Sequence, residues 1–251
     1  MKISVITVCF NSAATIRDTI ESVLSQRYSN LEYIIVDGGS TDNTMAIVNE
    51  YGDRIARMVS EPDRGIYDAM NKGVALATGD VVGFLNADDF YADADCVSDI
   101  AREITEAQVD SVFCDLVFVR PDNLEKVVRY YNSGNFHPGK FARGWMPAHP
   151  TFYCKKACYD QYGGYQIDYK IAADYELLTR FLYTNRVSYH YFPRVLVKMR
   201  TGGASTQSLR SNWILNQEIL RACRENNIQT NWVKVLSKYL VKMSELVFRP
   251  R

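Results

Sequence analysis

The sequence predicts an α/β fold: a mostly parallel sheet flanked by helices, with further helices at the C-terminus. Short apolar runs rich in β-branched residues alternate with segments of helical period, which is typical of parallel strands joined by crossover helices. In the first half these runs end in polar residues, and parallel strands present such ends at one edge of a sheet. With 251 residues the chain is long enough to bury a substantial core.

Each expected element follows from its local pattern. Continuous apolar runs bounded by turn residues predict strands at 3–10, 31–36, 54–60, 81–85 and 111–119. Apolar residues at helical spacing predict helices after Ser12 and at 42–51, 66–77, 94–107, 209–226 and 231–248, with one more starting near Ile171.

Composition excludes several classes of protein. Lys plus Arg and Asp plus Glu both number 29, so no global basic field of the kind that marks a nucleic-acid-binding protein is present. Six cysteines without a CxxC pair indicate buried free thiols in a reducing cytoplasm. The run at 3–10 is too short for a signal peptide, and no stretch approaches 18 apolar residues. We therefore expect a cytoplasmic protein, either soluble or peripheral at the inner face of the membrane.

Polar side chains follow three of the expected strands: Asn11, Asp37, and Asn86 with Asp88 and Asp89. Each has a simpler explanation as a cap or turn former. Together at one edge they favour a shared ligand, and adjacent carboxylates favour a divalent cation. Because both the GxGxxG fingerprint and the P-loop are absent, a carboxylate-bound metal is the physical alternative for holding phosphates.

Several segments resemble the family 2 glycosyltransferases of GT-A fold. The match is dense over about the first 115 residues and looser over about the next 90. The segments that carry it are 3–11, 22–26, 34–44 and 86–89. Segment 63–73, Asp-Arg-Gly-Ile-Tyr-Asp-Ala-Met-Asn-Lys-Gly, resembles the bacterial polysaccharide-assembly members, such as colanic acid, amylovoran and O-antigen-type transferases. The resemblance implies a nucleotide-sugar donor, expected to be a UDP-sugar, and inversion at the anomeric carbon.

Carried over by position, the resemblance implies a donor site. Val8 and Phe10 should line the base pocket with Asn11 nearby, and Asp37 should accept a hydrogen bond from the uracil imide. Lys72 is either a phosphate contact or a solvated helix residue.

The same resemblance implies a metal site for Mn²⁺ or Mg²⁺. Asp89 should be the main protein ligand, with Asp88 near both the ribose and the metal. Asn86 departs from the aspartate that many members carry, so it supplies no charge there.

The second half is expected to bind the acceptor. Loops as long as 135–150 are usually functional, and His149 at its end is either structural or near the acceptor or diphosphate. Asp174 matches the general base of the family's acidic pair, whose first member is Ala173 here. A carboxylate there would take the proton of the acceptor hydroxyl. Glu176 is a reserve candidate.

Two features near the C-terminus complete the expectations. Lys198 and Arg200 precede a Gly-Gly pair, which suggests a flap closing over the diphosphate or a plain loop. Segment 231–251 is basic and amphipathic, so it either touches a membrane surface or packs on the catalytic domain. We expect a GT-A domain at 1–205, divided into a nucleotide-sugar half (1–117) and an acceptor half (118–205), and a helical extension at 206–251.

These expectations combine into one function. The chain should be an inverting, metal-dependent glycosyltransferase of hexosyltransferase type, moving a sugar to a polyprenyl-diphosphate-linked saccharide in bacterial surface-polysaccharide biosynthesis. A non-catalytic module that binds nucleotide-sugar or polysaccharide remains an alternative. A sugar-phosphate nucleotidyltransferase is a weaker one, because its Gly-rich, basic N-terminal loop is absent.

Overall fold

The computed structural model describes residues 1–202 and 209–239. The first half of the chain contains β1 (Ile3–Cys9), α1 (Ile16–Leu24), β2 (Leu31–Asp37), α2 (Thr44–Asn49), the 3₁₀ helix η1 (Gly52–Arg54), β3 (Arg57–Ser60), α3 (Ile66–Leu76), β4 (Val81–Phe84), β5 (Asp89–Tyr91) and α4 (Cys96–Glu106).

The second half begins with two long strands. Its elements are β6 (Ser111–Arg120), β7 (Asn123–Tyr131), the 3₁₀ helices η2 (Pro138–Arg143) and η3 (His149–Thr151), β8 (Tyr153–Lys155), α5 (Lys156–Tyr162), α6 (Ala173–Thr179), the π-helix η4 (Arg180–Thr184), β9 (Tyr189–Arg200), α7 (Leu209–Glu225) and α8 (Trp232–Leu236).

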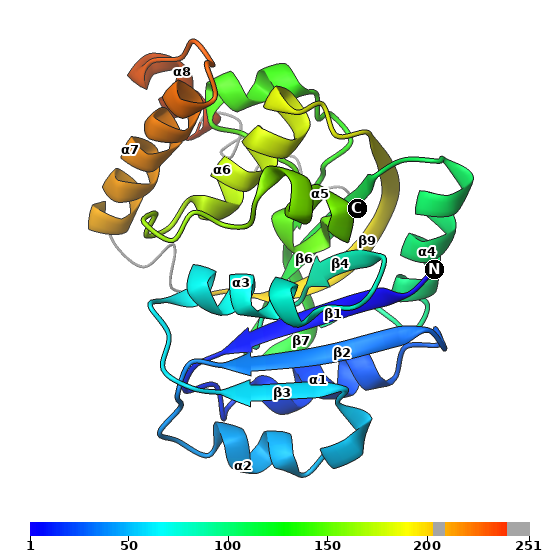
Figure 1. Cartoon of the computed structure of the whole chain (residues 1–251). Helices are drawn as coiled ribbons and strands as arrows, with labels where there is room; N and C mark the ends of the chain where they lie inside the picture. The colour runs from blue at the N-terminus through cyan, green and yellow to red at the C-terminus, as the bar shows by residue number, and fades with distance from the viewer. Residues whose placement is uncertain (203–208, 240–251) are drawn as a thin grey trace.

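Within the described residues the strands form one nine-stranded sheet, in the order β3-β2-β1-β4-β8-β6-β9-β5 with β7 beside β6. The stretch β3-β2-β1-β4 is wholly parallel, as the sequence predicts. Strands β1, β2 and β4 are buried on both faces, whereas β3 is an exposed edge strand. Helix α3 lies on one side of this sheet and α1 with α2 on the other (Figure 1). Alternate residues of β1 accordingly enter different cores, Ile6 beneath α3 and Val5 beneath α1.

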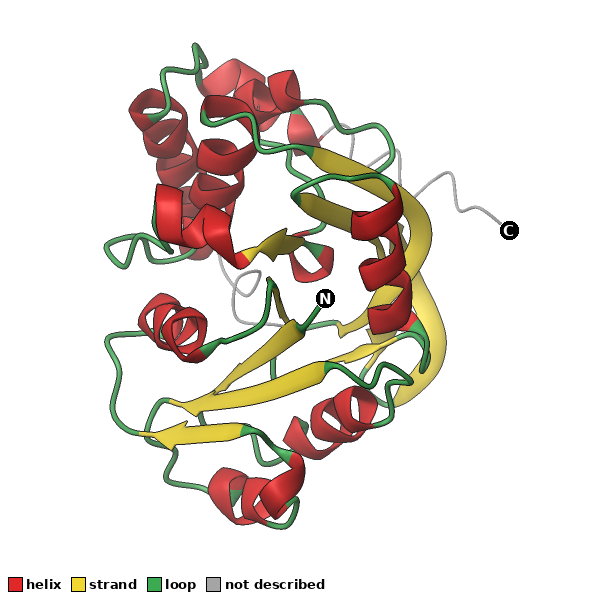
Figure 2. Cartoon of the chain, turned by 45° about the vertical axis from the view of Figure 1, so that its right-hand side comes forward, coloured by secondary structure: helices red, strands yellow, loops and turns green. Residues whose placement is uncertain are grey.

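Beyond β4 the sheet is mixed. The short strand β8 runs antiparallel to both β4 and β6, and β6 then pairs in parallel with β9. β9 is a long curved strand that runs along one side of the molecule (Figure 2). It also pairs antiparallel with β5 and so closes the sheet back toward the turn that follows β4.

The described C-terminal helices pack against the rest of the fold. Ile219 and Cys223 of α7 and Val235 of α8 share one hydrophobic core with α3 and α6. The predicted boundary at 205 falls outside the described residues, so the division into domains stays a prediction. All six cysteines are buried and free. In the part of the chain that the structure describes, no helix is long and apolar enough to cross a bilayer.

Candidate active site

Three turns meet at the carboxyl edge of the parallel strands. β1 and β2 pair so that Cys9 lies opposite Asp37, and β4 flanks β1 on its other side. The turns that leave these strands carry Asn11, Gly38 and Asn86. The predicted polar strand ends therefore share one edge, the place where open α/β sheets bind ligands.

Asp37 is turned into the protein at this edge. It is fully buried, and its carboxylate accepts hydrogen bonds from the N–H groups of Gly39 (3.1 Å) and Ser40 (3.0 Å) and from the hydroxyls of Ser40 and Ser60. Burial alone would raise the pKa of Asp37, but the hydrogen bonds from Ser40 and Ser60 outweigh burial and lower it. Asp37 therefore builds the turn at residues 38–40, and its predicted contact with uracil would require these bonds to rearrange.

Phe10 and Asn11 form the turn at the end of β1, next to the turn at residues 38–40. Asn11 adopts a left-handed conformation (φ 49°), its N–H donates to Ser40 Oγ (2.8 Å), and its Oδ1 accepts from Thr41 N–H (2.9 Å). Phe10 is 60% exposed, unusually open for a Phe, whereas Val8 is buried beneath α3. Of the residues predicted to line the base pocket, Phe10 therefore presents an open surface, whereas Val8 lies in the core.

Asp63 lies against Gly38 in the turn after β2, although no role was predicted for it. A Cβ added to Gly38 would lie 2.4 Å from Asp63 Oδ2, so the missing side chain leaves room for that carboxylate. Lys72 braces the same loop, with its Nζ 2.8 Å from Glu61 Oε1 and 3.2 Å from the Pro62 carbonyl. The predicted phosphate contact of Lys72 would require it to leave Glu61.

The two adjacent carboxylates after β4 have different surroundings. Asp88 is half-buried, and no ion pair or hydrogen bond links its carboxylate to another described residue. Asp89 is fully buried, its Oδ1 has no partner among the described residues, and Asn86 Nδ2 lies 3.5 Å from its Oδ2. Burial, followed by the charge of Asp88, raises the pKa of Asp89 well above its usual value. A cation at this turn would relieve both effects.

Arg200 of β9 binds the backbone of the turn that carries Asp88 and Asp89. It is 9% exposed, its Nη1 donates to the Asp88 carbonyl (2.6 Å), its Nη2 pairs with Asp18 of α1, and its guanidinium lies over the Phe90 ring. Lys198 pairs with Glu125 at 3.3 Å. Both cations belong to strand β9, so the flap prediction is wrong for 198–200. Residues 201–202 form a turn after β9, and the rest of that prediction, 203–205, lies outside the described residues.

His149 reaches the same edge from the second half of the chain. β8 is antiparallel to β4 with Tyr153 opposite Gly83, so η3, directly before β8, lies toward the end of β4. The turn is anchored by Thr151, which is fully buried and whose Oγ1 accepts from Cys114 N–H (2.9 Å). His149 itself is 35% exposed, so it projects from a rigid base.

Asp174 in the first turn of α6 meets His149. His149 Nδ1 lies 3.1 Å from Asp174 Oδ2, while Asp174 Oδ1 accepts from Tyr175 N–H (2.8 Å). Tyr67 and Tyr165 stack at 5.8 Å beside this pair. The pKa of each tyrosine is raised, first by burial and then by the negative charge of Asp174. Two candidates 25 positions apart in the chain are thus brought into contact.

Two further contacts, neither of them predicted, hold the segment that leads into α6, whose first turn carries Asp174. The N–H groups of residues 170–172, just before α6, all donate to the carboxylate of Glu218 in α7. Asn71 of α3 clasps the backbone of Tyr165, accepting its N–H (2.7 Å) and donating to its carbonyl (2.8 Å). The reserve candidate Glu176 is buried and paired with Arg180 at 2.8 Å, which gives it a structural partner.

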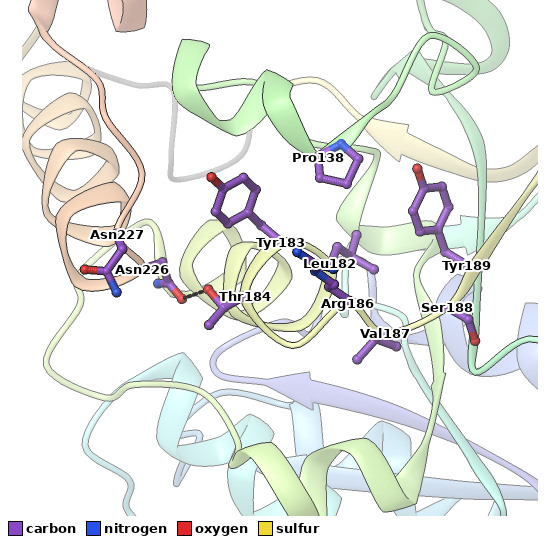
Figure 3. Close-up of a pocket in the computed structure, with 10 residues that line it drawn as sticks. All are labelled: Pro138, Leu182, Tyr183, Thr184, Arg186, Val187, Ser188, Tyr189, Asn226 and Asn227. Atoms are coloured by element: carbon purple, nitrogen blue, oxygen red, sulfur yellow. Dashed lines mark hydrogen bonds between the residues drawn. The ribbon is translucent and has the colours of Figure 1, made fainter.

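A hollow of about 630 Å³ lies elsewhere (Figure 3). It is formed by η4, the start of β9 and the end of α7, with Tyr183, Arg186 and Asn227 around it. Because Tyr189 pairs with Ser111, this hollow lies where the strands begin, away from Asp88. None of its ten described lining residues carries a carboxylate or an imidazole.

Comparison with known proteins identifies the family. The model of glycosyl transferase family 2 matches residues 4–160, more than half of the chain. The chain belongs to glycosyl transferase family 2. The resemblance stated from the motifs is therefore confirmed at the level of the family.

Two relatives align with most of this chain in sequence. A PGL/p-HBAD biosynthesis glycosyltransferase of Mycobacterium bovis is 27% identical over 270 residues, spanning 99% of this chain and 97% of its own length. An uncharacterized glycosyltransferase of Mycobacterium tuberculosis is 34% identical over 180 residues, spanning 71% of this chain and 68% of its own.

Solved structures share the fold. Staphylococcus aureus TarS 1–349 with UDP-GlcNAc superposes with a TM-score of 0.70 at 19% identity, over 88% of this chain and 66% of that one. The mannosyltransferase PcManGT of Pyrobaculum calidifontis, with GDP-Man and Mn²⁺, gives 0.65 at 22% identity, over 89% and 63%. The chain thus spans just under two thirds of these solved chains. The predicted GT-A fold is confirmed.

Proposed function

We propose that this family 2 glycosyltransferase moves a sugar from a nucleotide-sugar, most simply a UDP-sugar, to a saccharide hydroxyl with inversion. One observation carries the proposal: the free carboxylate of Asp88 and the Asp174–His149 pair reach the same sheet edge from the two halves of the chain. The TarS complexes contain UDP or UDP-GlcNAc, and the PcManGT complex contains GDP-Man, which supports a nucleotide-sugar donor.

The donor would lie along the first three turns. Its base would stack on the exposed ring of Phe10, beside Asn11, and Asp63 would accept from the base imide in place of the buried Asp37. The diphosphate would extend toward Asp88. Lys72 is retained as an indirect contributor, since it braces the loop that carries Asp63.

A divalent cation, Mn²⁺ or Mg²⁺, fits the turn after β4. Asp88 supplies an accessible carboxylate, and Asp89 supplies a buried oxygen that lacks a partner among the described residues. No group of three His, Cys, Asp or Glu suited to a metal occurs within residues 1–202 and 209–239. This agrees with a cation held by one or two carboxylates together with substrate phosphates. We therefore assign the principal contact with the cation to Asp88, and a secondary contact to Asp89, which the sequence predicts as the main ligand. When bound, the cation would neutralise charge on the departing diphosphate.

The acceptor would approach from the side of Asp174. Its hydroxyl must lose a proton while it attacks the anomeric carbon opposite the leaving group, and the negative charge of Asp174 makes that loss favourable. Glu218 and Asn71 hold the segment before α6, so this carboxylate is fixed before substrate arrives. Arg200 positions Asp88 through its backbone carbonyl and thereby acts on the diphosphate indirectly.

The acceptor class and location are part of the proposal. Trp213 of α7 and Trp232 of α8 stack at 4.9 Å, and beside them Val233 is 80% and Leu236 44% exposed. Exposed tryptophans are typical of a membrane interface, which favours a lipid-linked acceptor at the inner face of the cell membrane and a role in surface-polysaccharide assembly of the colanic acid or O-antigen type. Within residues 231–239, the described part of segment 231–251, the other face packs on the domain, because Val235 and Lys238 are buried.

Calorimetry with UDP and a panel of UDP-sugars, with and without Mn²⁺, tests the donor site. Asp88→Asn should abolish the gain in affinity from Mn²⁺ and leave metal-free binding intact. Asp63→Asn should weaken binding equally in both conditions. An Asp88→Asn protein that gains as much from Mn²⁺ as the unmodified protein would refute the metal assignment. Binding without transfer to any acceptor would instead favour the non-catalytic module.

A further inference from the structure

The hollow of about 630 Å³ adjoins a smaller one of about 170 Å³, and the two share Arg186 and Val187. Together they form one elongated groove along residues 182–189, between α5 and the end of α7, which we call the distal groove. Sites for small molecules commonly have volumes of about 300–1,000 Å³, so the distal groove is large enough for a ligand. Its elongated shape suits a chain of linked units better than a single compact molecule.

Several polar side chains around the distal groove have no partner in the described part of the chain. The Tyr183 hydroxyl, the Arg186 guanidinium and the Asn227 amide form no hydrogen bond or ion pair there. Figure 3 shows Arg186 flanked by the rings of Tyr183 and Tyr189. Aromatic rings can pack on the apolar face of a sugar, while amide and guanidinium groups can bind its hydroxyls. The side chains of the distal groove therefore match the chemistry of a saccharide.

The backbone indicates that two of these side chains are needed. Four non-glycine residues in the described ranges have a positive φ, and two of them, Arg186 (φ 51°) and Asn227 (φ 57°), line the distal groove. Each follows the end of a helix, η4 or α7, at a position that glycine usually occupies because other residues are strained there. After η2 and α5 the chain does use glycine, at Gly144 and Gly163. In addition, η4 is a π-helix, a rare form that frequently occurs at functional sites.

The charges around the distal groove favour an acidic ligand. Lys155 pairs with Asp110 at 2.9 Å, and Asp110 also accepts a hydrogen bond from Ser188 Oγ at 2.6 Å. The charges of Lys155 and Asp110 therefore offset each other. Among the described lining residues, Arg186 is then the cation that lacks a counter-charge. A guanidinium can bind a carboxylate through two parallel hydrogen bonds, an arrangement that a single sugar hydroxyl cannot match.

One continuous helix connects the distal groove with the candidate active site. Helix α6 carries Asp174 in its first turn and continues directly into η4, because Thr179 and Arg180 both keep helical angles (φ −63°). At about 1.5 Å per residue, the helix from Asp174 to Thr184 is about 15 Å long. A ligand that occupies both places must therefore be a saccharide of several units.

We propose that the distal groove binds the far part of the acceptor, an acidic saccharide of several units whose carboxylate pairs with Arg186. This inference rests on the proposed glycosyl transfer, because it places the reacting hydroxyl of the same saccharide at Asp174. Arg186 touches none of the reacting atoms. It raises the affinity for long acidic acceptors and leaves the chemical step unchanged.

Calorimetry on the full chain, without donor and without Mn²⁺, tests this binding. The probes are oligogalacturonides and hyaluronan fragments, with neutral malto-oligosaccharides of equal length for comparison. We expect the acidic probes to bind more tightly, and Arg186→Gly to weaken their binding about tenfold or more. Glycine accepts the backbone angle at 186, so this variant should stay folded and bind UDP normally. Gln108→Gly is the matched control, since Gln108 is exposed, has a φ of 52° and lies outside the distal groove.

The outcomes separate this inference from the proposed function. Equal affinity for neutral and acidic probes, no binding of either acidic probe, or the same loss in Arg186→Gly and Gln108→Gly would overturn the distal groove as an acidic-saccharide site. The transferase could still be correct in each of these cases. Binding of acidic probes through Arg186 in a protein that transfers no sugar would refute the proposed function and leave the binding site standing. In a protein that does transfer, Arg186→Gly should raise KM for long acidic acceptors and leave kcat unchanged.

Discussion

Replacing Thr151 by Val removes the anchor of η3 with almost no change in shape. The Thr151 hydroxyl accepts from Cys114 N–H at 2.9 Å and lies 2.7 Å from the Ala148 carbonyl, in a position that water does not reach. Valine fills the same volume but can neither accept nor donate, so the buried Cys114 N–H loses its partner.

The size of the effect follows from that stranded donor. A buried polar group left unsatisfied costs about 1–3 kcal/mol, so Thr151→Val should lower the free energy of unfolding by about 2 kcal/mol. That is roughly a 30-fold change in the folding equilibrium, since 1.4 kcal/mol is about tenfold. Thr151→Ser is the control, because it keeps the hydroxyl and loses only a methyl, worth about 1 kcal/mol.

Urea unfolding followed by circular dichroism measures the difference. With a slope of about 2–3 kcal/mol/M, the midpoint for Thr151→Val should fall by roughly 0.7–1 M and that for Thr151→Ser by about half as much. Transfer activity at low urea should fall for Val only, because His149 lies two residues away on the loosened turn. If the Val protein proves as stable as the Ser protein, the hydroxyl does not anchor η3 and the reasoning fails.

Three other substitutions follow from single contacts. Burial would raise the pKa of Glu32, but its bonded partners lower it to about 2. The ionised group therefore stabilises the fold above its ordinary pKa of 4.5 and loses that contribution as pH falls toward 2. Glu32→Gln should remove about 2 kcal/mol of the stability difference between pH 7 and pH 3, as read from urea unfolding. Gly83→Ala would put a Cβ 2.1 Å from the buried Tyr153 ring and should cost about 3 kcal/mol; a melting temperature within a few degrees of normal would contradict the packing. Arg200→Met should lower the free energy of unfolding by about 2 kcal/mol and weaken Mn²⁺-dependent nucleotide binding. Lys198→Met should change the free energy of unfolding by less than about 0.5 kcal/mol, because its partner Glu125 is exposed. If calorimetry and urea unfolding give equal results for the two variants, Arg200 has no special role.

Most of the parallel half of the fold was predictable because three of its strands, β1, β2 and β4, are buried on both faces. β1, β2 and β4 therefore read as continuous apolar runs, and α3 and α4 carry a clear helical period. β7 and β8 were missed for opposite reasons. β7 has no fully buried position, and its apolar residues are broken up by charged ones, so they form neither a continuous run nor a regular alternation. β8 has only three residues and exists because β4 and β6 pair with it.

The candidate site was predicted residue by residue but not in its orientations. A sequence places Asp37, Asp88 and Asp89 at strand ends, yet the choice between facing the solvent and facing the core depends on which neighbours satisfy them. Asp37 faces the core because Ser40 and Ser60 donate hydrogen bonds to its carboxylate. Asp89 interacts with Arg200, which lies on a strand over a hundred positions away in the sequence. The contact between His149 and Asp174 depends on the reversal at β8, for which local sequence gives no signal.

The clasp between Asn71 and Tyr165 limits how this enzyme can be recombined with its relatives. Asn71 binds only the backbone of residue 165, so the clasp itself places no demand on that side chain. It does restrict the preceding position, because a Cβ on Gly164 would lie 2.2 Å from Asn71 Oδ1. A chimaera that joins a donor half to a foreign acceptor half should therefore carry Asn71 and Gly164 as a matched pair. Otherwise the seam would misplace α6, and the hybrid would bind nucleotide without delivering sugar.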